Sequence, residues 1–222
     1  MRGMRERHLI AFLTTVQFVN MVDFVMMMPL GPLLMRSLGI GTHEFSWLVS
    51  SYTFASAISG VLAGFVIDRF DRRRVMVPLL VFFSLATMAC AWAPTLEWMI
   101  LMRAAAGFFG GVLGTLTMAI VPDAIPPERR GRALGMIMAS FAIASIVGIP
   151  IGMTLAVHQG WHAPFLWLGV VGLVVSGWAV IAFPSMVSHI HAVRPTPLAT
   201  FIAVFSVPSH WRAFALSVSL VL

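Results

Sequence analysis

The sequence predicts an all-α membrane protein, on the strength of its composition and of the pattern of its charges. Of the 222 residues, 59% are hydrophobic and only 10% are charged, and the mean hydropathy is +0.95. Six apolar runs are each about as long as the roughly 20 residues that a helix needs to cross a bilayer core about 30 Å thick. The arginines lie almost entirely between these runs. We therefore expect six transmembrane helices.

The first span follows a basic amino-terminal segment, residues 1–8, and its apolar run continues to about Leu34. A cleaved signal peptide has an apolar region of only roughly 7 to 15 residues, so we expect this run to stay in the mature protein. The second and third spans flank a dense charged turn. The five later spans are expected at residues 45–67, 75–93, 98–121, 133–157 and 165–183.

The composition changes after residue 183, where prolines and histidines punctuate the chain. Residues 184–210 are therefore expected to form a cytoplasmic linker between two halves. From Trp211 the chain is apolar again, but about 12 residues give about 18 Å of helix, which is too short to cross a bilayer. The expected parts are a six-helix transmembrane bundle at residues 1–183, the linker, and the truncated start of a seventh helix at residues 211–222.

The distribution of basic residues predicts the topology. All 14 basic residues are arginines, and 12 of them fall on one side of the expected membrane, with Arg36 on the other side and Arg103 within a span. Loops rich in arginine are retained in the cytoplasm. The amino terminus is therefore expected to be cytoplasmic, and six helices return the chain to that side.

The turn between the second and third spans carries the pattern G-x-x-x-D-R-x-x-R-R, formed by Gly64, Asp68, Arg69, Arg72 and Arg73. This pattern resembles the signature of the major facilitator superfamily of secondary transporters. Asp71 stands where the family usually has glycine, and we expect aspartate to tolerate the positive φ that a glycine there suggests. The alternative is that the turn is only a basic topology signal.

The resemblance implies the fold and a role for the turn. The fold is the amino-terminal half of a major facilitator transporter, built as two inverted three-helix repeats. Asp123 matches the carboxylate that in this family meets the charged turn. Charge pairs and helix dipoles at these helix ends can hold one state of a rocking bundle. The expected conformational latch consists of Gly64, Asp68, Arg69, Arg72, Arg73 and Asp123.

Two charged residues, Asp23 and Arg103, lie inside expected spans, where charge is costly and suggests function. If the first helix enters near Leu9, Asp23 lies about 21 Å along it, leaving roughly 9 Å to the outer face. Arg103 lies roughly 8 Å deep from that same face. A carboxylate and a guanidinium at one level can pair, which lowers the cost of burying both.

Asp23 ends a polar series on the first span, Thr14, Gln17, Asn20 and Asp23. Lipid cannot satisfy polar side chains, so this series is expected to face the bundle or a water-filled cavity. The candidate substrate cavity is Gln17, Asn20, Asp23 and Arg103, in which Asp23 exchanges the coupling proton and Arg103 sets its affinity. The alternative is a structural hydrogen-bond network between helices.

Glycines in the fourth and fifth spans predict close helix packing. The segment Arg103–Gly107 resembles the family's helix 4 signature. Gly148, Pro150 and Gly152 loosely resemble the glycine-proline motif of its proton antiporters, although the adjacent G-P and the final G-G are absent. Residues 122–132, 147–152 and 160–165 look most like the sugar-efflux and arabinose-efflux branch of proton-coupled exporters.

Several other functions find no support in the sequence. The chain has no lysine and no G-x-x-x-x-G-K-[ST] loop, which excludes ATP-driven transport by this chain alone. It has no G-x-S-x-G or H-E-x-x-H pattern, so an enzyme is not expected. Cys90 is the single cysteine, and His189 and His191 have no third ligand nearby, so no metal or other cofactor is expected. The charges lie between spans, which argues against nucleic acid as a partner.

We therefore predict a secondary active transporter in the cell inner membrane, with proton-coupled efflux of a sugar or a drug-like small molecule. Its expected partners are the substrate, protons, the lipid bilayer and a missing carboxy-terminal half. One alternative is uptake by the same fold, and another is a non-transporting truncated fragment or assembly module. The short seventh helix favours truncation of a chain of about twelve helices over a natural half-size transporter.

Overall fold

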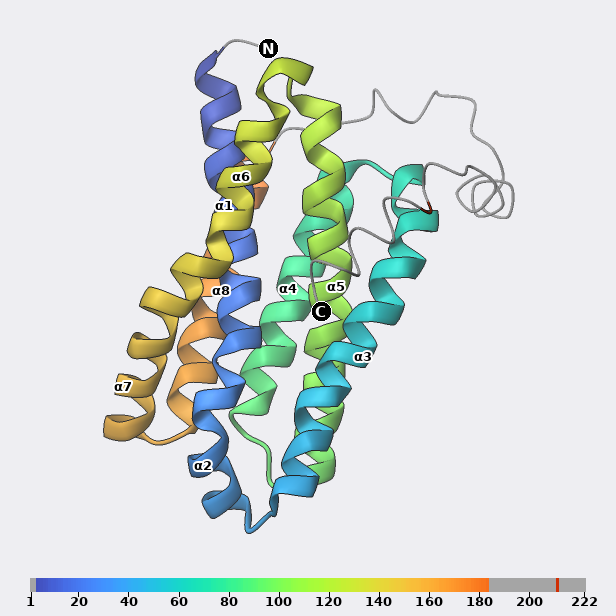
Figure 1. The fold of residues 1–222 in the computed structure, drawn as a ribbon. Helices are drawn as coiled ribbons and strands as arrows, with labels where there is room; N and C mark the ends of the chain where they lie inside the picture. The colour runs from blue at the N-terminus through green and yellow to red at the C-terminus, as the bar shows by residue number, and fades with distance from the viewer. Residues whose placement is uncertain (1–2, 184–210, 212–222) are drawn as a thin grey trace. The chain divides into compact units, whose positions relative to one another are not determined.

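The computed structural model describes residues 3–183 and residue 211 of the chain. The expected linker at 184–210, with His189 and His191, and all of the expected seventh helix except Trp211 lie outside the described residues. Residues 3–183 form helices and short turns, with no strand among them. The α-helices are α1 Gly3–Val25, α2 Met27–Leu38, α3 Thr42–Val66, α4 Arg72–Cys90, α5 Leu96–Ala124, α6 Pro127–Ile143, α7 Ile149–Gln159 and α8 His162–Ala182 (Figure 1).

Six segments in this part of the chain are long and apolar enough to cross a membrane, and each overlaps one predicted span. They are Glu6–Val25, Thr42–Val66, Arg72–Cys90, Leu96–Ala124, Pro127–Gln159 and His162–Ile181. The all-α membrane fold is therefore confirmed. The fourth segment begins earlier than predicted because Thr95 caps its start, accepting a hydrogen bond from the Trp98 amide at 3.3 Å.

The first span differs from the single run that the sequence suggested. It divides at Met26 into α1 and α2, and Gly39 ends α2 in the left-handed conformation with φ 64°. Pro29 explains the break, because proline has no N–H to donate to the carbonyl of Val25 and its ring crowds that carbonyl. Hydrogen bonds from Met26 to Val22 and from Leu30 to Met26 carry the chain across the break.

The charged turn also corrects one expectation. Asp71 has φ −58°, and none of the described residues other than glycine has a positive φ. Asp71 is instead the N-cap of α4, where its side chain accepts a hydrogen bond from the Arg73 amide at 3.1 Å. An aspartate at this position accepts a hydrogen bond from a free helix amide, and its negative charge interacts favourably with the positive end of the helix dipole. A left-handed turn is therefore unnecessary here.

Glycines let α5 approach α3 closely. A side chain at Gly107 would overlap the backbone of Tyr52, and one at Gly111 would overlap the backbone of Ser56. On its other flank α5 packs against α4, which packs in turn against α8 (Figure 1). The packing interpretation of these glycines agrees with the structure, and it brings polar groups of α3 and α5 within contact distance.

The fifth span contains a π-helical segment, Ala144–Gly148, between α6 and α7. Pro150 lies two residues after this segment and has no N–H for the carbonyl of Ile146, which disturbs the regular α-helical bonding at this level. An added Cβ at Gly148 would lie 2.6 Å from Val22, and one at Gly152 would lie 2.5 Å from the sulfur of Met26. The helix 5 motif thus packs against α1 where α1 ends.

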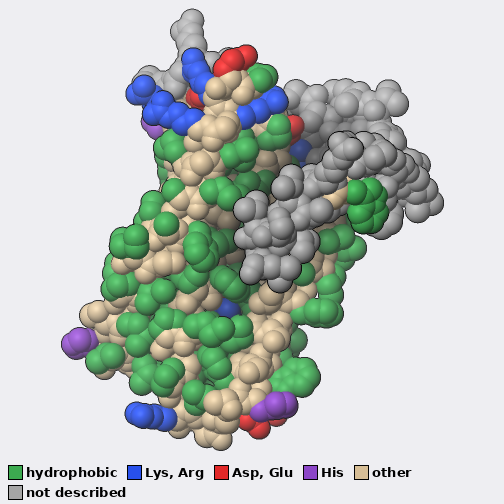
Figure 2. All heavy atoms as spheres, in the orientation of Figure 1, with side chains coloured by type: hydrophobic (Ala, Val, Ile, Leu, Met, Phe, Trp, Pro, Cys, Tyr) green, Lys and Arg blue, Asp and Glu red, His purple; other side chains and the backbone are tan. Residues whose placement is uncertain are grey.

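Charged side chains gather at one end of the bundle. On the face drawn in Figure 2, basic side chains cluster where α1 and α6 begin, and hydrophobic side chains cover much of the rest. At this arginine-rich end, Arg129 of α6 donates a hydrogen bond to Glu6 of α1 at 3.1 Å. This distribution agrees with a bundle that crosses a membrane.

Candidate functional site

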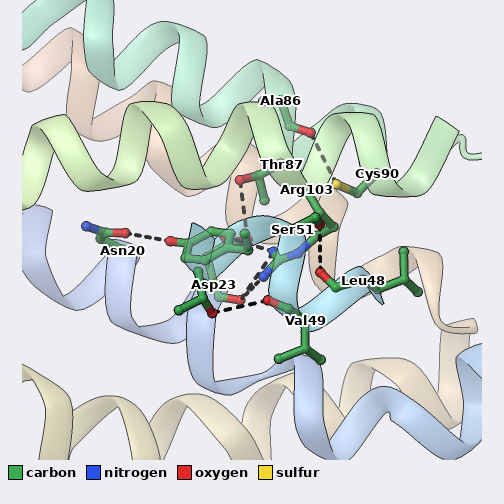
Figure 3. A network of polar contacts seen from close by, with 11 residues as sticks. Asn20, Asp23, Leu48, Val49, Ser51, Ala86, Thr87, Cys90 and Arg103 are labelled. Carbon is green, nitrogen blue, oxygen red and sulfur yellow. Dashed lines mark hydrogen bonds and ion pairs between the residues drawn. The ribbon is translucent and has the colours of Figure 1, made fainter. Parts of the chain in front are cut away.

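The two charges predicted inside the membrane meet in a buried ion pair. Arg103 of α5 donates from Nη1 to Oδ2 of Asp23 on α1 at 3.0 Å, and the two side chains are 1% and 0% exposed (Figure 3). Thr87 of α4 donates to the other carboxylate oxygen, Oδ1, at 3.3 Å. The site therefore joins three helices, and each charge compensates for the burial of the other.

Arg103 has further contacts that fix its position. Its Nη1 and Nη2 atoms lie 3.5 Å from the backbone oxygen of Asp23, and its guanidinium carbon lies 4.3 Å from the centre of the Tyr52 ring. A guanidinium over an aromatic ring is stabilised by a cation–π interaction. Nε of Arg103 has no hydrogen-bond partner among the described residues. The guanidinium is thus held between a carboxylate and an aromatic ring.

Tyr52 of α3 connects this pair to a second polar group. Its hydroxyl donates to Oδ1 of Asn20 at 2.9 Å, and Nδ2 of Asn20 donates to the carbonyl of Gly110 at 2.9 Å. A side chain at Gly110 would lie 2.8 Å from Asn20 and 2.9 Å from the tyrosine hydroxyl. Glycine at 110 is therefore needed to leave room for the network.

A groove of about 540 Å³ lies beside this network, between α1, α3 and α5. Two of the predicted cavity residues, Gln17 and Asn20, line it, and Tyr52 does as well. Asp23 and Arg103 are not among the lining residues, since both are fully buried. Tyr52 contacts both Asn20 and Arg103, so it connects the groove to the ion pair.

Sequence reasoning missed Tyr52, although one signal was present. It is the only tyrosine in the chain, and it falls inside a predicted span. A hydroxyl in the hydrocarbon region needs a hydrogen-bond partner, as the polar series on the first span does. The partner itself comes from a different helix, which no local pattern reveals.

The predicted latch residues lie at the arginine-rich end. Arg72 donates to Oδ2 of Asp123 from Nη2 at 2.8 Å and from Nε at 3.1 Å, which joins α4 to α5. Nη2 of Arg73 donates to the carbonyl of Val180 on α8. Arg69 is exposed, and no described atom lies within 4 Å of a Cβ placed on Gly64. The side chain of Asp68 lies outside the described part of the structure.

A six-span bundle with a buried ion pair beside an open groove is the architecture of a polytopic membrane protein. Residues 13–222 match the Major Facilitator Superfamily, and the chain belongs to this family. The family is one of transporters, which agrees with the expectation that the chain is not an enzyme.

The chain is 30% identical over 194 residues to "Uncharacterized MFS-type transporter YceJ" of Bacillus subtilis (strain 168), covering 87% of this chain and 50% of that protein. It is 32% identical over 122 residues to "Multidrug resistance protein 3" of the same organism, covering 55% of this chain and 24% of that protein. It therefore spans half or less of the length of these relatives.

The fold is similar to that of a bacterial homologue of the human lysosomal transporter Spinster in an inward-facing, unoccupied conformation. The TM-score is 0.76 at 15% identity, over 95% of this chain and 51% of that chain. At this identity the likeness concerns the fold, and it agrees with one half of a major facilitator transporter.

Proposed function

We propose that this chain forms the amino-terminal half of a proton-coupled exporter of a small molecule, in which Asp23 exchanges the coupling proton and Arg103 sets its affinity. The observation that carries the proposal is the fully buried ion pair between these two residues within a membrane-spanning bundle. Ionisable groups at such positions are costly, and they mark ion pathways and proton relays in membrane proteins.

The contacts around the pair suggest how a proton is coupled to substrate. Protonation of Asp23 removes the charge that compensates Arg103, so the salt bridge between α1 and α5 weakens. Tyr52 contacts Arg103 on one side and Asn20 on the other. A substrate that hydrogen-bonds Asn20 in the groove therefore competes for Asn20 with Tyr52, whose ring contacts Arg103. In this proposal the protonation state of Asp23 and the occupancy of the groove influence each other.

The direction, location and substrate are parts of the same proposal. Similarity to a multidrug resistance protein supports export of a drug-like molecule, by antiport with protons. A sugar as substrate rests on the motif resemblance to the sugar-efflux branch. The arginine-rich end supports a cytoplasmic amino terminus in a cell inner membrane. Uptake by the same fold is the alternative for direction, since the fold does not determine it.

A second six-helix half is the proposed partner of this chain. The relatives are at least about twice as long as the matched segment, and sites in this family lie between two halves. The groove between α1, α3 and α5 is open, and a second half would close it. The latch pair Arg72 and Asp123 lies at the end where the halves would rock against each other.

The test is proton-driven flux in vesicles that carry the protein expressed from its complete gene. Asp23→Asn preserves the size of the side chain and removes its titration, so we expect gradient-driven flux to fall by at least tenfold while substrate still binds. Glu97→Gln is the matched control, since this exposed carboxylate lies in the first turn of the same helix as Arg103. Undiminished flux in Asp23→Asn would contradict the proposal.

A second measurement separates the alternatives about the partner. Liposomes that contain only residues 1–222 are expected to show no substrate-dependent proton movement. Robust movement from this chain alone would show that it transports without a second half. Failure of both this chain and the complete gene product to transport any tested sugar or drug would favour the non-transporting module.

A further inference from the structure

A second groove, of about 500 Å³, lies between α3, α4 and α5, away from the polar network. We propose that it binds one anionic phospholipid, with the phosphate at Arg74 and an acyl chain in the groove. This proposal does not depend on the transported substrate or on the direction of transport.

The groove is apolar along its length and basic at one end. Among the described residues that line it, only Ser59 and Arg74 carry polar side chains, and the Ser59 hydroxyl already donates to the carbonyl of Ser56 at 3.1 Å. All three helices are long and apolar enough to span a membrane. In such a position hydrocarbon is the available solvent, so an acyl chain is the expected occupant.

The order of residues along α4 matches the layout of a phospholipid. Arg74, Pro78 and Phe82 follow each other at intervals of four, so they lie on the same face of the helix and all line the groove. Eight residues span about 12 Å, which places the charge at the arginine-rich end and the aromatic ring well inside the membrane. A phospholipid whose phosphate binds Arg74 thus has its acyl chain alongside the apolar part of the groove.

Arg74 differs from its two neighbours in sequence. Arg72 pairs with Asp123, and Arg73 donates to the carbonyl of Val180. Arg74 is exposed and has no hydrogen bond or ion pair with any described residue. A guanidinium binds phosphate through two parallel N–H donors, and none of the described residues that line the groove is acidic. Basic pockets between helices on the cytoplasmic side of a membrane are a recognised mode of anionic lipid binding.

Aromatic side chains form the floor of the groove. The rings of Phe82 and Phe109 are stacked, with centroids 5.4 Å apart, and Phe108 packs edge-on against Phe109 at 5.6 Å. On the wall formed by α3, Leu62 is 52% exposed. Ring packing therefore holds the aromatic side chains in place, and Leu62 is an exposed wall position.

The experiment measures lipid retained by the purified 222-residue chain by native mass spectrometry, with phosphatidylglycerol and phosphatidylcholine of identical acyl chains. The unchanged chain is expected to retain one phosphatidylglycerol in preference to phosphatidylcholine. Arg74→Gln should weaken retention of phosphatidylglycerol by about tenfold, the scale of one charge-assisted contact, and should abolish the preference. Arg132→Gln is the control, because Arg132 is also exposed at the arginine-rich end and does not line the groove.

A second variant tests the apolar part of the site. Leu62→Trp adds bulk at an exposed wall position, so it should reduce retention of both lipids without loss of helical content by circular dichroism. Equal phosphatidylglycerol retention by Arg74→Gln and Arg132→Gln would overturn the proposal. A chain that retains no lipid would also overturn it, because the groove would then be covered by protein. Lipid retention that is unchanged in Leu62→Trp would overturn it as well, because the lipid would then bind outside the groove.

Discussion

Tyr52 and Asn20 provide a quantitative test of the site, because each depends on the other within a buried network. Tyr52→Phe keeps the ring beneath Arg103 and removes only the hydroxyl that donates to Asn20 at 2.9 Å. The remaining Asn20 oxygen loses its partner, which costs about 1–3 kcal/mol for a buried acceptor. We expect the lower part of that range, about 1 kcal/mol, because Asn20 lines the groove and water can replace the hydroxyl there.

The double-mutant cycle isolates the contact from other effects of each change. Asn20→Ala removes the acceptor and also leaves the Gly110 carbonyl without its donor, so this single variant should cost more than Tyr52→Phe. Once Asn20→Ala has removed the acceptor, Tyr52→Phe has no hydrogen bond left to break. The double variant should therefore lose less stability than the sum of the two single variants, by a coupling energy of about 0.5–1.5 kcal/mol. The assay is unfolding by sodium dodecyl sulfate in mixed micelles, followed by circular dichroism.

The control cycle pairs Tyr52→Phe with Ser145→Ala in the π-helical segment, whose hydroxyl bonds only locally to Phe141 among the described residues. That pair should be additive within about 0.5 kcal/mol. Additive effects of Tyr52→Phe and Asn20→Ala would refute the reasoning that the two residues form one network.

Further predictions concern the packing of α5 and the latch. Gly111→Leu should destabilise the bundle by about 3 kcal/mol or more, because any side chain at 111 overlaps the backbone of Ser56, and a shift smaller than 1 kcal/mol in the same unfolding assay would contradict this packing. Thr117→Val should leave stability unchanged or raise it by up to about 1 kcal/mol, since its buried hydroxyl has no partner among the described residues, and marked destabilisation would show that an unseen partner exists. In the product of the complete gene, Asp68→Asn and Asp123→Asn should slow turnover more than they weaken substrate binding, and transport at the unchanged rate would exclude a latch.

Sequence reasoning was strongest where one physical constraint acts on each helix separately. The bilayer thickness limits how deep a residue lies, so counting from each end of a span put Asp23 and Arg103 at one level without any knowledge of their contact. The same reasoning cannot show that Tyr52 lies against Arg103, because that contact depends on how closely α3 approaches α5. The approach is set by glycines at 107 and 111, whose partners lie about 55 residues away in sequence.

Local backbone chemistry explains the two expectations that failed. Hydropathy does not reveal a break between two equally apolar helices, so the apolar run to Leu34 looked continuous. Pro29 was the residue that indicated the turn at Met26. At Asp71 the family pattern suggested a glycine-like turn, whereas an aspartate just before a helix is more simply an N-cap. In both cases the hydrogen-bonding needs of particular amides and carbonyls decided the conformation.

The buried ion pair also constrains how the chain is made. Asp23 and Arg103 are separated by 80 residues, so at synthesis rates of about 5–20 residues per second the aspartate leaves the ribosome on the order of 4–16 s before its partner. A lone aspartate in a span costs up to about 2.5–3.5 kcal/mol on entering the bilayer, the value at the helix centre. Thr87 offers a hydroxyl earlier, yet no compensating charge arrives until α5 is made. We therefore expect the first helix to stay beside the insertion machinery until the fourth span, which carries Arg103, has been made.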